Sequence, residues 1–193
     1  RVLDLLYGLM LRSGNDAAIE ISRVVAGNMD NMARLMNEKA KALNMTNTLF
    51  INASGLENEE GLGNKSTAYD MALLMSYALK NKVFTQIIGT KNYKTQSSYK
   101  SYVWHNKNKL LDSYEYCIGG KTGFTKKSRR TLVTAASRED KTLVVVTLND
   151  PDDFALFRDD EVIDGIIGTA LETVHENLAP DALLNLIIIV WMD

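Results

Sequence analysis

Residues 119–149 constrain the fold of this chain more than any other segment. They contain two apolar runs rich in β-branched residues, at 132–136 and 143–148, separated by a charged segment at 137–141. Apolar runs of this length, bounded by polar clusters, are typical of buried strands. The sequence therefore predicts two neighbouring strands joined by a short polar turn.

A glycine-rich segment, Gly119-Gly120-Lys121-Thr122-Gly123, precedes these two strands. Glycines in a strand pattern mark a place where another backbone or a ligand comes close. The Lys121 ammonium can bind an anion, and the Thr122 hydroxyl can donate to the same anion. The bare edge at Gly123 leaves backbone groups open to an extended peptide. The alternative is a surface lysine at the entry to a strand, because three-residue matches are common by chance.

Composition indicates a soluble globular protein with a sizeable core. The chain has 193 residues, of which 46% are hydrophobic and 24% charged, and its formal net charge of −2 does not suggest nucleic acid as a partner. Its single cysteine, Cys117, excludes an internal disulfide and is expected to be a small buried apolar residue. Two histidines and one cysteine do not favour a structural zinc site. The sequence implies no metal and no organic cofactor.

Apolar side chains at spacings of three and four predict several helices. The second of them begins after a polar break, with Asn15 or Asp16 as its N-cap. Between the helices, the sequence predicts a loop at 45–65 with a short strand at 48–51, and a hairpin or irregular excursion at 93–109. An apolar stretch at 183–192 is too short to span a bilayer and is expected to be a buried strand or helix, or else a membrane-surface segment. The predicted helices span residues 3–11, 17–26, 29–43, 68–79, 82–88 and 161–176.

A second short motif, Ser13-Gly14-Asn15, lies in the break between the first two helices. A serine in such a loop can relay a proton, and the Asn15 amide can both donate and accept hydrogen bonds. Together with Lys121 and Thr122, this motif indicates acyl transfer by a serine enzyme on a peptide that ends in a carboxylate.

The combination of Ser-Gly-Asn and Lys-Thr-Gly resembles the shared pattern of penicillin-binding proteins and class A β-lactamases. The sequence is most similar to the low-molecular-mass D-alanyl-D-alanine carboxypeptidases of peptidase family S11. Gly14 favours this branch, because class A β-lactamases usually have Asp at that position. The resemblance implies a partial D,D-peptidase catalytic domain at 1–153, with an unrecognised tail at 154–193. It rests on residues 5–18, 36–40, 66–72, 106–111 and 119–125.

The family implies an α+β fold of the β-lactamase/transpeptidase type, an antiparallel sheet with flanking helices. It also implies that Ser13 takes part in proton transfer and that Asn15 contacts the substrate. Lys121 and Thr122 would bind the terminal carboxylate of D-Ala-D-Ala, and the substrate would dock as a strand at Gly123.

Two further residues acquire roles only through the resemblance. The backbone N–H of Phe124 would form one half of the oxyanion hole. Lys107 would add positive potential, or else is a solvated surface lysine. The implied partners are peptidoglycan stem peptides ending in D-Ala-D-Ala, with β-lactams as acylating inhibitors, outside the cytoplasm. The sequence does not tell whether the protein is attached to a membrane.

The sequence departs from the family pattern at the nucleophile. The family's S-x-x-K motif lies well upstream of Ser13, where this sequence has twelve residues; its one literal match, Ser97 to Lys100, sits in a polar, strand-like context. The sequence therefore predicts an N-terminally truncated domain without its nucleophile. Such a domain would expose the apolar faces of the helices at 3–11 and 17–26 and would dissolve poorly or associate. Ser54 stands where many members have histidine, so local substrate contacts would differ.

Two alternatives remain open from sequence. A β-lactamase-like hydrolase would need a deacylating glutamate, and Glu60 with Asn64 offers one at a suggestive spacing. A non-catalytic cell-wall or partner-binding module would keep the fold and omit the nucleophile.

Overall fold

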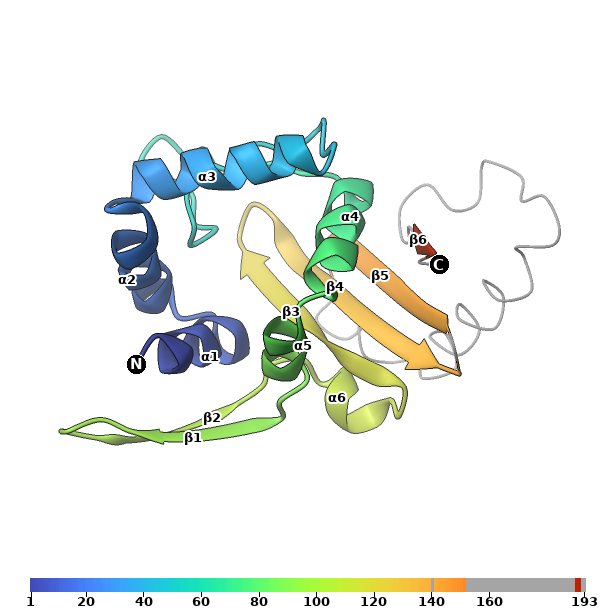
Figure 1. Ribbon diagram of the computed structural model, residues 1–193. Helices are drawn as coiled ribbons and strands as arrows, with labels where there is room; N and C mark the ends of the chain where they lie inside the picture. Colours follow the sequence, from blue (N-terminus) through green and yellow to red (C-terminus); the bar gives the residue numbers. More distant parts are fainter. Residues whose placement is uncertain (140, 152–189, 192–193) are drawn as a thin grey trace, which may run out of the picture.

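The computed structural model describes residues 1–139, 141–151 and 190–191 (Figure 1). The predicted helix at 161–176 and nearly all of the tail lie outside this part. The described elements up to residue 88 are helices and most of those after it are strands, as predicted for an α+β fold. The helices are α1 (Val2–Arg12), α2 (Asn15–Ala26), α3 (Met29–Ala42), α4 (Ala68–Ala78), α5 (Lys82–Ile88) and α6 (Leu110–Ser113).

Side-chain caps set the beginnings of three helices. The side chains of Asn28, Thr67 and Asn81 accept hydrogen bonds from the first-turn N–H groups of α3, α4 and α5. The predicted cap of α2 is wrong. Gly14 is its N-cap, Asn15 is its first helical residue, and the Asp16 carboxylate accepts instead from the N–H of Ala17.

The main sheet is antiparallel, with strands in the order β3-β4-β5-β6. The predicted strands at 132–136 and 143–148 are the centres of β4 and β5, and both extend beyond the predicted bounds. The glycine-rich segment that precedes these two strands lies in the middle of a third strand, β3. The strands are β3 (Cys117–Thr125), β4 (Arg129–Arg138), β5 (Lys141–Asp150) and β6 (Val190–Trp191).

Close packing of β3 on β4 explains why β3 contains glycine. A Cβ atom on Gly120 would lie 2.4 Å from the carbonyl oxygen of Val133 on β4. A Cβ atom on Gly119, whose φ is +135°, would lie 2.6 Å from the backbone of Ile88 in α5. Both positions therefore require glycine for steric reasons that are independent of any ligand.

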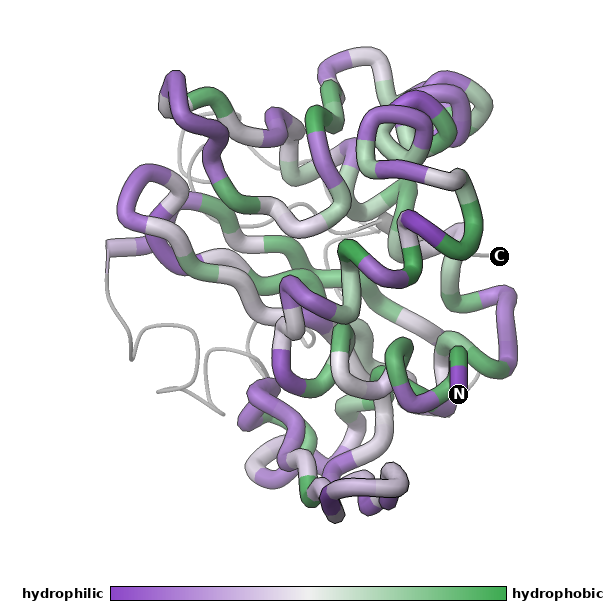
Figure 2. The backbone as a smooth tube through the Cα atoms, turned by 90° about the vertical axis from the view of Figure 1, so that its left-hand side faces the viewer, coloured by the Kyte–Doolittle hydropathy of each residue, from purple (hydrophilic) through white to green (hydrophobic). Residues whose placement is uncertain are grey.

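Side chains of β4 and β5 alternate between two hydrophobic clusters, one on each face of the sheet. On one face, α4 and α5 pack on the strands through Ala72, Met75, Ile88, Ala135, Val144 and Val146. On the other face, α6 and the segment after it pack through Leu110, Tyr114, Leu132, Ala136 and Leu143. Figure 2 shows these hydrophobic stretches in the middle of the molecule, with hydrophilic stretches at the loops around it.

The predicted excursion at 93–109 is a hairpin of β1 (Asn92–Gln96) and β2 (Ser101–His105) that packs on α1. The rings of Tyr7 and Tyr93 stack with their centroids 3.7 Å apart, and a Cβ atom on Gly8 would lie 3.3 Å from the Trp104 ring. The strand predicted at 48–51 is wrong, because only a single bridge joins Leu49 to Lys65 there.

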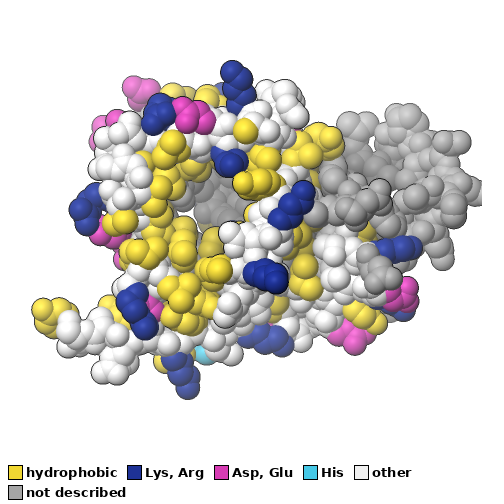
Figure 3. Space-filling view, in the orientation of Figure 1, with side chains coloured by type: hydrophobic (Ala, Val, Ile, Leu, Met, Phe, Trp, Pro, Cys, Tyr) yellow, Lys and Arg dark blue, Asp and Glu magenta, His cyan; other side chains and the backbone are white. Residues whose placement is uncertain are grey.

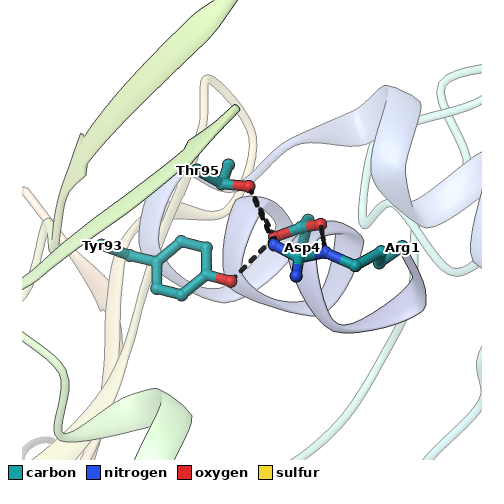
Figure 4. Close-up of polar contacts among 4 residues, drawn as sticks. All are labelled: Arg1, Asp4, Tyr93 and Thr95. Atoms are coloured by element: carbon teal, nitrogen blue, oxygen red, sulfur yellow. Dashed lines mark hydrogen bonds and ion pairs between the residues drawn. The ribbon is translucent and has the colours of Figure 1, made fainter. Parts of the chain in front are cut away.

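A cluster of four polar residues ties the hairpin to the beginning of α1 (Figure 4). The Asp4 carboxylate accepts from the Tyr93 hydroxyl at 2.7 Å and from the Thr95 hydroxyl at 2.8 Å, and it pairs with Arg1 at 2.9 Å. The hydrogen bonds from Arg1, Tyr93 and Thr95 hold the pKa of Asp4 well below its usual value.

The predicted exposure of apolar side chains on the first two helices is confirmed in part. On α1 the exposed residues are Val2 and Leu3, whereas Tyr7 and Leu11 are buried. On α2 they are Ile19, Val24 and Val25. Figure 3 shows hydrophobic side chains gathered on the α1 and α2 side of the molecule, around a hollow in that face. Within the described part of the chain, no helix is both long and apolar enough to cross a membrane.

Candidate active site

The site centres on a contact between Lys121 on β3 and Ser13 after α1. The Lys121 ammonium donates to Ser13 Oγ at 2.5 Å, across 108 positions of sequence. It also donates to the carbonyl oxygen of Thr122. The fold therefore brings the Ser-Gly-Asn and Lys-Thr-Gly motifs together, as the sequence predicted.

The break between α1 and α2 fixes Ser13. Its backbone is left-handed, with φ 57° and ψ 45°, and it ends α1. The next N–H, that of Gly14, donates to the carbonyl oxygen of Gly8 at 3.2 Å. The N–H of Lys107 donates to the carbonyl oxygen of Leu11 at 3.3 Å, which joins this helix end to the segment after β2. The strained conformation turns the chain sharply and points the Ser13 hydroxyl at Lys121.

Lys121 is poised to change its protonation state near neutral pH. Burial lowers its pKa to about 8, and the positive charge of Lys107 adds to this effect. At pH 7 the ammonium form still predominates, so Lys121 can hold an anion. Because its pKa is close to neutral, a fraction of Lys121 is the neutral amine, which can accept a proton as well as donate one.

One edge of β3 is hydrogen-bonded to β4, and among the described strands none pairs with the other edge. Thr122 and Gly123 lie along this strand and are half-buried. A Cβ atom on Gly123 would lie 2.5 Å from Thr131 Oγ1, so a side chain there would require the Thr131 side chain to shift. The unpaired edge of β3 is what docking of an extended peptide requires.

Phe124 follows Gly123 and is 58% exposed. The guanidinium of Arg130, the partner of Phe124 on β4, lies 4.3 Å from the centre of the Phe124 ring.

Two other predicted site residues form no hydrogen bond with Ser13 or Lys121 in this structure. Asn15 is exposed at the start of α2, and the structure shows no hydrogen bond that joins it to Ser13 or Lys121. Lys107 is exposed and acts on Lys121 through its charge.

The one S-x-x-K match lies in the turn between β1 and β2. Ser97 Oγ donates to the carbonyl oxygen of Lys100 and accepts from the N–H of Lys100, both at 3.0 Å. The Lys100 ammonium lies over the ring of Tyr102, 5.4 Å from its centre. Serine and lysine therefore sit in a hairpin turn at the far tip of β1 and β2 (Figure 1), not on a helix beside Ser13.

The glutamate of the β-lactamase alternative has no catalytic geometry in this structure. Glu60 is exposed, and its N–H donates to the Asn58 side chain. The Asn64 side chain is occupied within its own loop, where it accepts from the N–H groups of Ile51 and Asn52.

The structure adds one contact near the site that the sequence did not predict. The Thr125 hydroxyl at the end of β3 donates to the Glu57 carboxylate at 2.5 Å. Glu57 lies in a segment rich in glutamate, which usually indicates a solvated surface, so no pattern in the sequence marks it.

Cys117 is half-buried rather than buried. Its thiol lies near the side chains of Thr134 and Asn108, and burial raises its pKa. It is therefore a weakly reactive thiol at the beginning of β3. Within residues 1–139 and 141–151, no three His, Cys, Asp or Glu side chains are grouped so that they could hold a metal ion.

Comparison with known proteins identifies the family. The sequence model of the peptidase S11 family, described as D-alanyl-D-alanine carboxypeptidase, matches residues 1–152. A D-alanyl-D-alanine carboxypeptidase of Mycobacterium tuberculosis is 38% identical over 144 residues, which cover 75% of this chain and 49% of the relative. A D-alanyl-D-alanine carboxypeptidase of Bacillus subtilis is 33% identical over 146 residues, covering 75% and 37%. The chain thus spans about half or less of the length of these relatives.

Solved structures of a DD-transpeptidase and a penicillin-binding protein are similar to this chain. A mutant of a Streptomyces DD-transpeptidase superposes with a TM-score of 0.75 at 32% identity, over 88% of this chain and 68% of that one. A penicillin-binding protein of Listeria monocytogenes in its cefotaxime-bound form gives 0.77 at 28% identity, over 86% and 65%. The predicted α+β, transpeptidase-like fold is confirmed. This chain belongs to the peptidase S11 family of D-alanyl-D-alanine carboxypeptidases.

Proposed function

We propose that this chain carries the substrate-binding and proton-relay side of a serine-type D-Ala-D-Ala carboxypeptidase. The reaction would remove the terminal D-Ala from peptidoglycan stem peptides outside the cytoplasm. The observation that carries the proposal is the 2.5 Å contact between Lys121 Nζ and Ser13 Oγ, which joins the two family motifs in one site.

Each predicted residue has a task in this reaction. Lys121 and Thr122 bind the terminal carboxylate, because the Lys121 ammonium and the Thr122 hydroxyl are hydrogen-bond donors on β3, along which the peptide docks. As the nucleophilic serine attacks the scissile carbonyl, Ser13 accepts its proton and passes a proton to the amine that leaves, with Lys121 as its hydrogen-bond partner. Asn15 contacts the substrate amide from the start of α2.

Two further groups complete this half of the site. The Phe124 N–H stabilises the oxyanion that forms on the scissile carbonyl, and the substrate backbone docks along β3 at Gly123. Lys107 adds positive potential that favours the anionic substrate and lowers the pKa of Lys121. Each role is compatible with where the residue lies.

The one S-x-x-K match among these residues, Ser97 to Lys100, is bound up in a hairpin turn, so we propose that residues 1–152 supply the substrate-binding side and that neither Ser97 nor Ser98 is the acylated serine. β-Lactams would acylate only an enzyme that contains the nucleophile. A non-catalytic cell-wall-binding module would bind the same peptides. Acylation by a β-lactam distinguishes it from a carboxypeptidase, because only a protein with the nucleophilic serine is acylated.

Titration calorimetry with an N-acylated tripeptide ending in D-Ala-D-Ala tests the binding role. We expect the free acid to bind and the C-terminal amide to bind at least about tenfold more weakly, because Lys121 recognises the charge. Lys121→Met should remove this preference. Lys41→Ala, an exposed lysine on α3, is the matched control and should leave it unchanged. Equal affinity for the acid and the amide would contradict the proposal.

A fluorescent penicillin tests the absence of the nucleophile. We expect no stable adduct after denaturing electrophoresis, with a complete family member labelled in parallel. An adduct mapped by mass spectrometry to Ser13, Ser97 or Ser98 would overturn the assignment of roles.

A further inference from the structure

The end of the substrate strand is held by a contact from a distant loop. The Thr125 hydroxyl donates to the Glu57 carboxylate at 2.5 Å, across 68 positions of sequence. The same hydroxyl oxygen accepts from the N–H of Ser128 at 3.0 Å. Thr125 is the last residue of β3, so this contact fixes the point where the strand turns toward β4.

A second contact joins the same two segments. The Lys127 ammonium, in the turn after β3, donates to the carbonyl oxygen of Gly61 at 2.7 Å. Thr125 hydrogen-bonds Glu57, and Lys127 acts on the same carboxylate by its charge; together they lower the pKa of Glu57. The loop is therefore attached at both ends of its 57–61 segment.

The attached loop is itself ordered by hydrogen bonds. Asn58 Oδ1 accepts from the N–H groups of Glu60 and Leu62, and the Asn58 N–H donates to the Leu62 carbonyl oxygen at 2.7 Å. At its base, Asn64 holds the backbone of Ile51 and Asn52. A preformed loop can hold the strand end in one place at a small cost in conformational entropy.

Large apolar side chains are exposed beside both partners of the contact. Leu56 precedes Glu57 and is 47% exposed, Leu62 follows the attached segment and is 47% exposed, and Phe124 precedes Thr125 and is 58% exposed. Exposed apolar residues on ordered segments at the end of a docking strand suit the carbon-rich part of an extended peptide.

We propose that Glu57 is a positioning residue that, through Thr125, fixes the Phe124 end of β3 and thereby the part of the peptide upstream of the terminal D-Ala-D-Ala. This inference rests on the proposed function, because Lys121 and Thr122 define where the carboxylate end lies. Glu57 does not touch the reacting atoms. It decides how well the acyl side of the substrate is held.

Hydrogen–deuterium exchange of the free protein tests the structural half. Glu57→Ala and Thr125→Val should each raise exchange at residues 122–125 and 55–62. Glu57→Gln keeps a hydrogen-bond acceptor and Thr125→Ser keeps a donor, so the exchange rates of both variants should stay close to those of the original protein. Glu59→Ala removes an exposed neighbouring carboxylate and is the matched control. Unchanged exchange in Glu57→Ala and Thr125→Val would overturn the proposal.

Calorimetry with two ligands tests the substrate half. The dipeptide D-Ala-D-Ala occupies only the carboxylate end, whereas an N-acylated tripeptide ending in the same dipeptide also reaches Phe124. We expect Glu57→Ala and Thr125→Val to lower the affinity for the tripeptide about five- to tenfold, as loss of one charge-assisted hydrogen bond implies. The affinity for the dipeptide should stay unchanged. Glu57→Gln and Thr125→Ser should restore tripeptide binding.

The outcomes separate this inference from the proposed function. Raised exchange with unchanged tripeptide affinity would overturn the role of Glu57 in substrate binding. An equal loss for both ligands would show a general disturbance of the site and would also overturn it. If neither peptide binds the original protein, the proposed function fails with the substrate role, and raised exchange then assigns Glu57 to the stability of β3 alone.

Discussion

Lys121 combines burial with a positive charge, and this has a consequence for stability. Its pKa is about 8 in the folded protein against a usual value of 10.5, because burial penalises the ammonium. Below pH 8 the folded and unfolded states are both protonated, and the folded state bears the full penalty. Between pH 8 and 10.5 the unfolded state binds more protons, so the free energy of unfolding rises with pH. We expect Lys121→Met to stabilise the protein by about 1–2 kcal/mol at pH 7.

Urea unfolding at a series of pH values measures this effect. The difference between Lys121→Met and the original protein should shrink as pH rises from about 8 to 10.5, as the penalty disappears. Lys41→Met, on the exposed face of α3, should show no such trend. A pH-independent difference would mean that packing and lost hydrogen bonds, rather than the charge, determine it.

At this scale, the sequence marked Ser13 and Lys121, which are in contact, but not how each is held. Ser13 and Lys121 were recognisable because each lies in a short motif with one chemical use. Glu57 was not, since a carboxylate in a glutamate-rich loop is indistinguishable in sequence from a solvated one. The conformation of Ser13 was also unpredictable, because a left-handed serine depends on how α1 and α2 pack.

Among the elements, the joint between α1 and the hairpin of β1 and β2 depends on Asp4. Its carboxylate accepts hydrogen bonds from Tyr93 and Thr95, and these bonds hold its pKa well below the usual value. A carboxyl with a lowered pKa stabilises the fold above its unfolded pKa and loses this effect as pH falls toward the folded pKa. We expect Asp4→Ala to lower the free energy of unfolding by about 1–2 kcal/mol at pH 7.

Unfolding experiments at pH 7 and at successively lower pH values provide the measurement. The difference between Asp4→Ala and the original protein should narrow below pH 3.8, the usual pKa of the group. Glu38→Ala breaks an exposed ion pair with Arg34 on α3 and should cost little, which makes it the control. If Asp4→Ala lowered the free energy of unfolding as little as Glu38→Ala does, Asp4 would have no structural role between α1 and the hairpin.

Element prediction succeeded where side-chain periodicity is strong and failed where it is weak. The helix at 82–88 and the centres of β4 and β5 have clear apolar patterns, and all three are confirmed. In β3, glycine and lysine interrupt the strand pattern, although the strand runs through them because β4 packs against the glycines. The four-residue α6 is too short for a period of 3.6 to be recognised.

At the scale of the whole molecule, the exposed apolar side chains of α1 and α2 govern behaviour in solution. Val2, Leu3, Ile19, Val24 and Val25 are each about half exposed. They belong to α1 and α2, and Figure 3 shows hydrophobic side chains gathered on that side of the molecule. Exposed apolar side chains gathered on one side favour association in water. We expect the chain to associate increasingly with concentration, as measured by sedimentation velocity.

The double variant Val24→Ser, Val25→Ser should associate less without a lower melting temperature, because neither side chain is part of the core. Val103→Ser, on the hairpin, removes a comparably exposed apolar side chain that belongs to neither helix and should leave association unchanged. A monodisperse monomer at all concentrations, with one cooperative thermal transition, would show that this surface does not drive association.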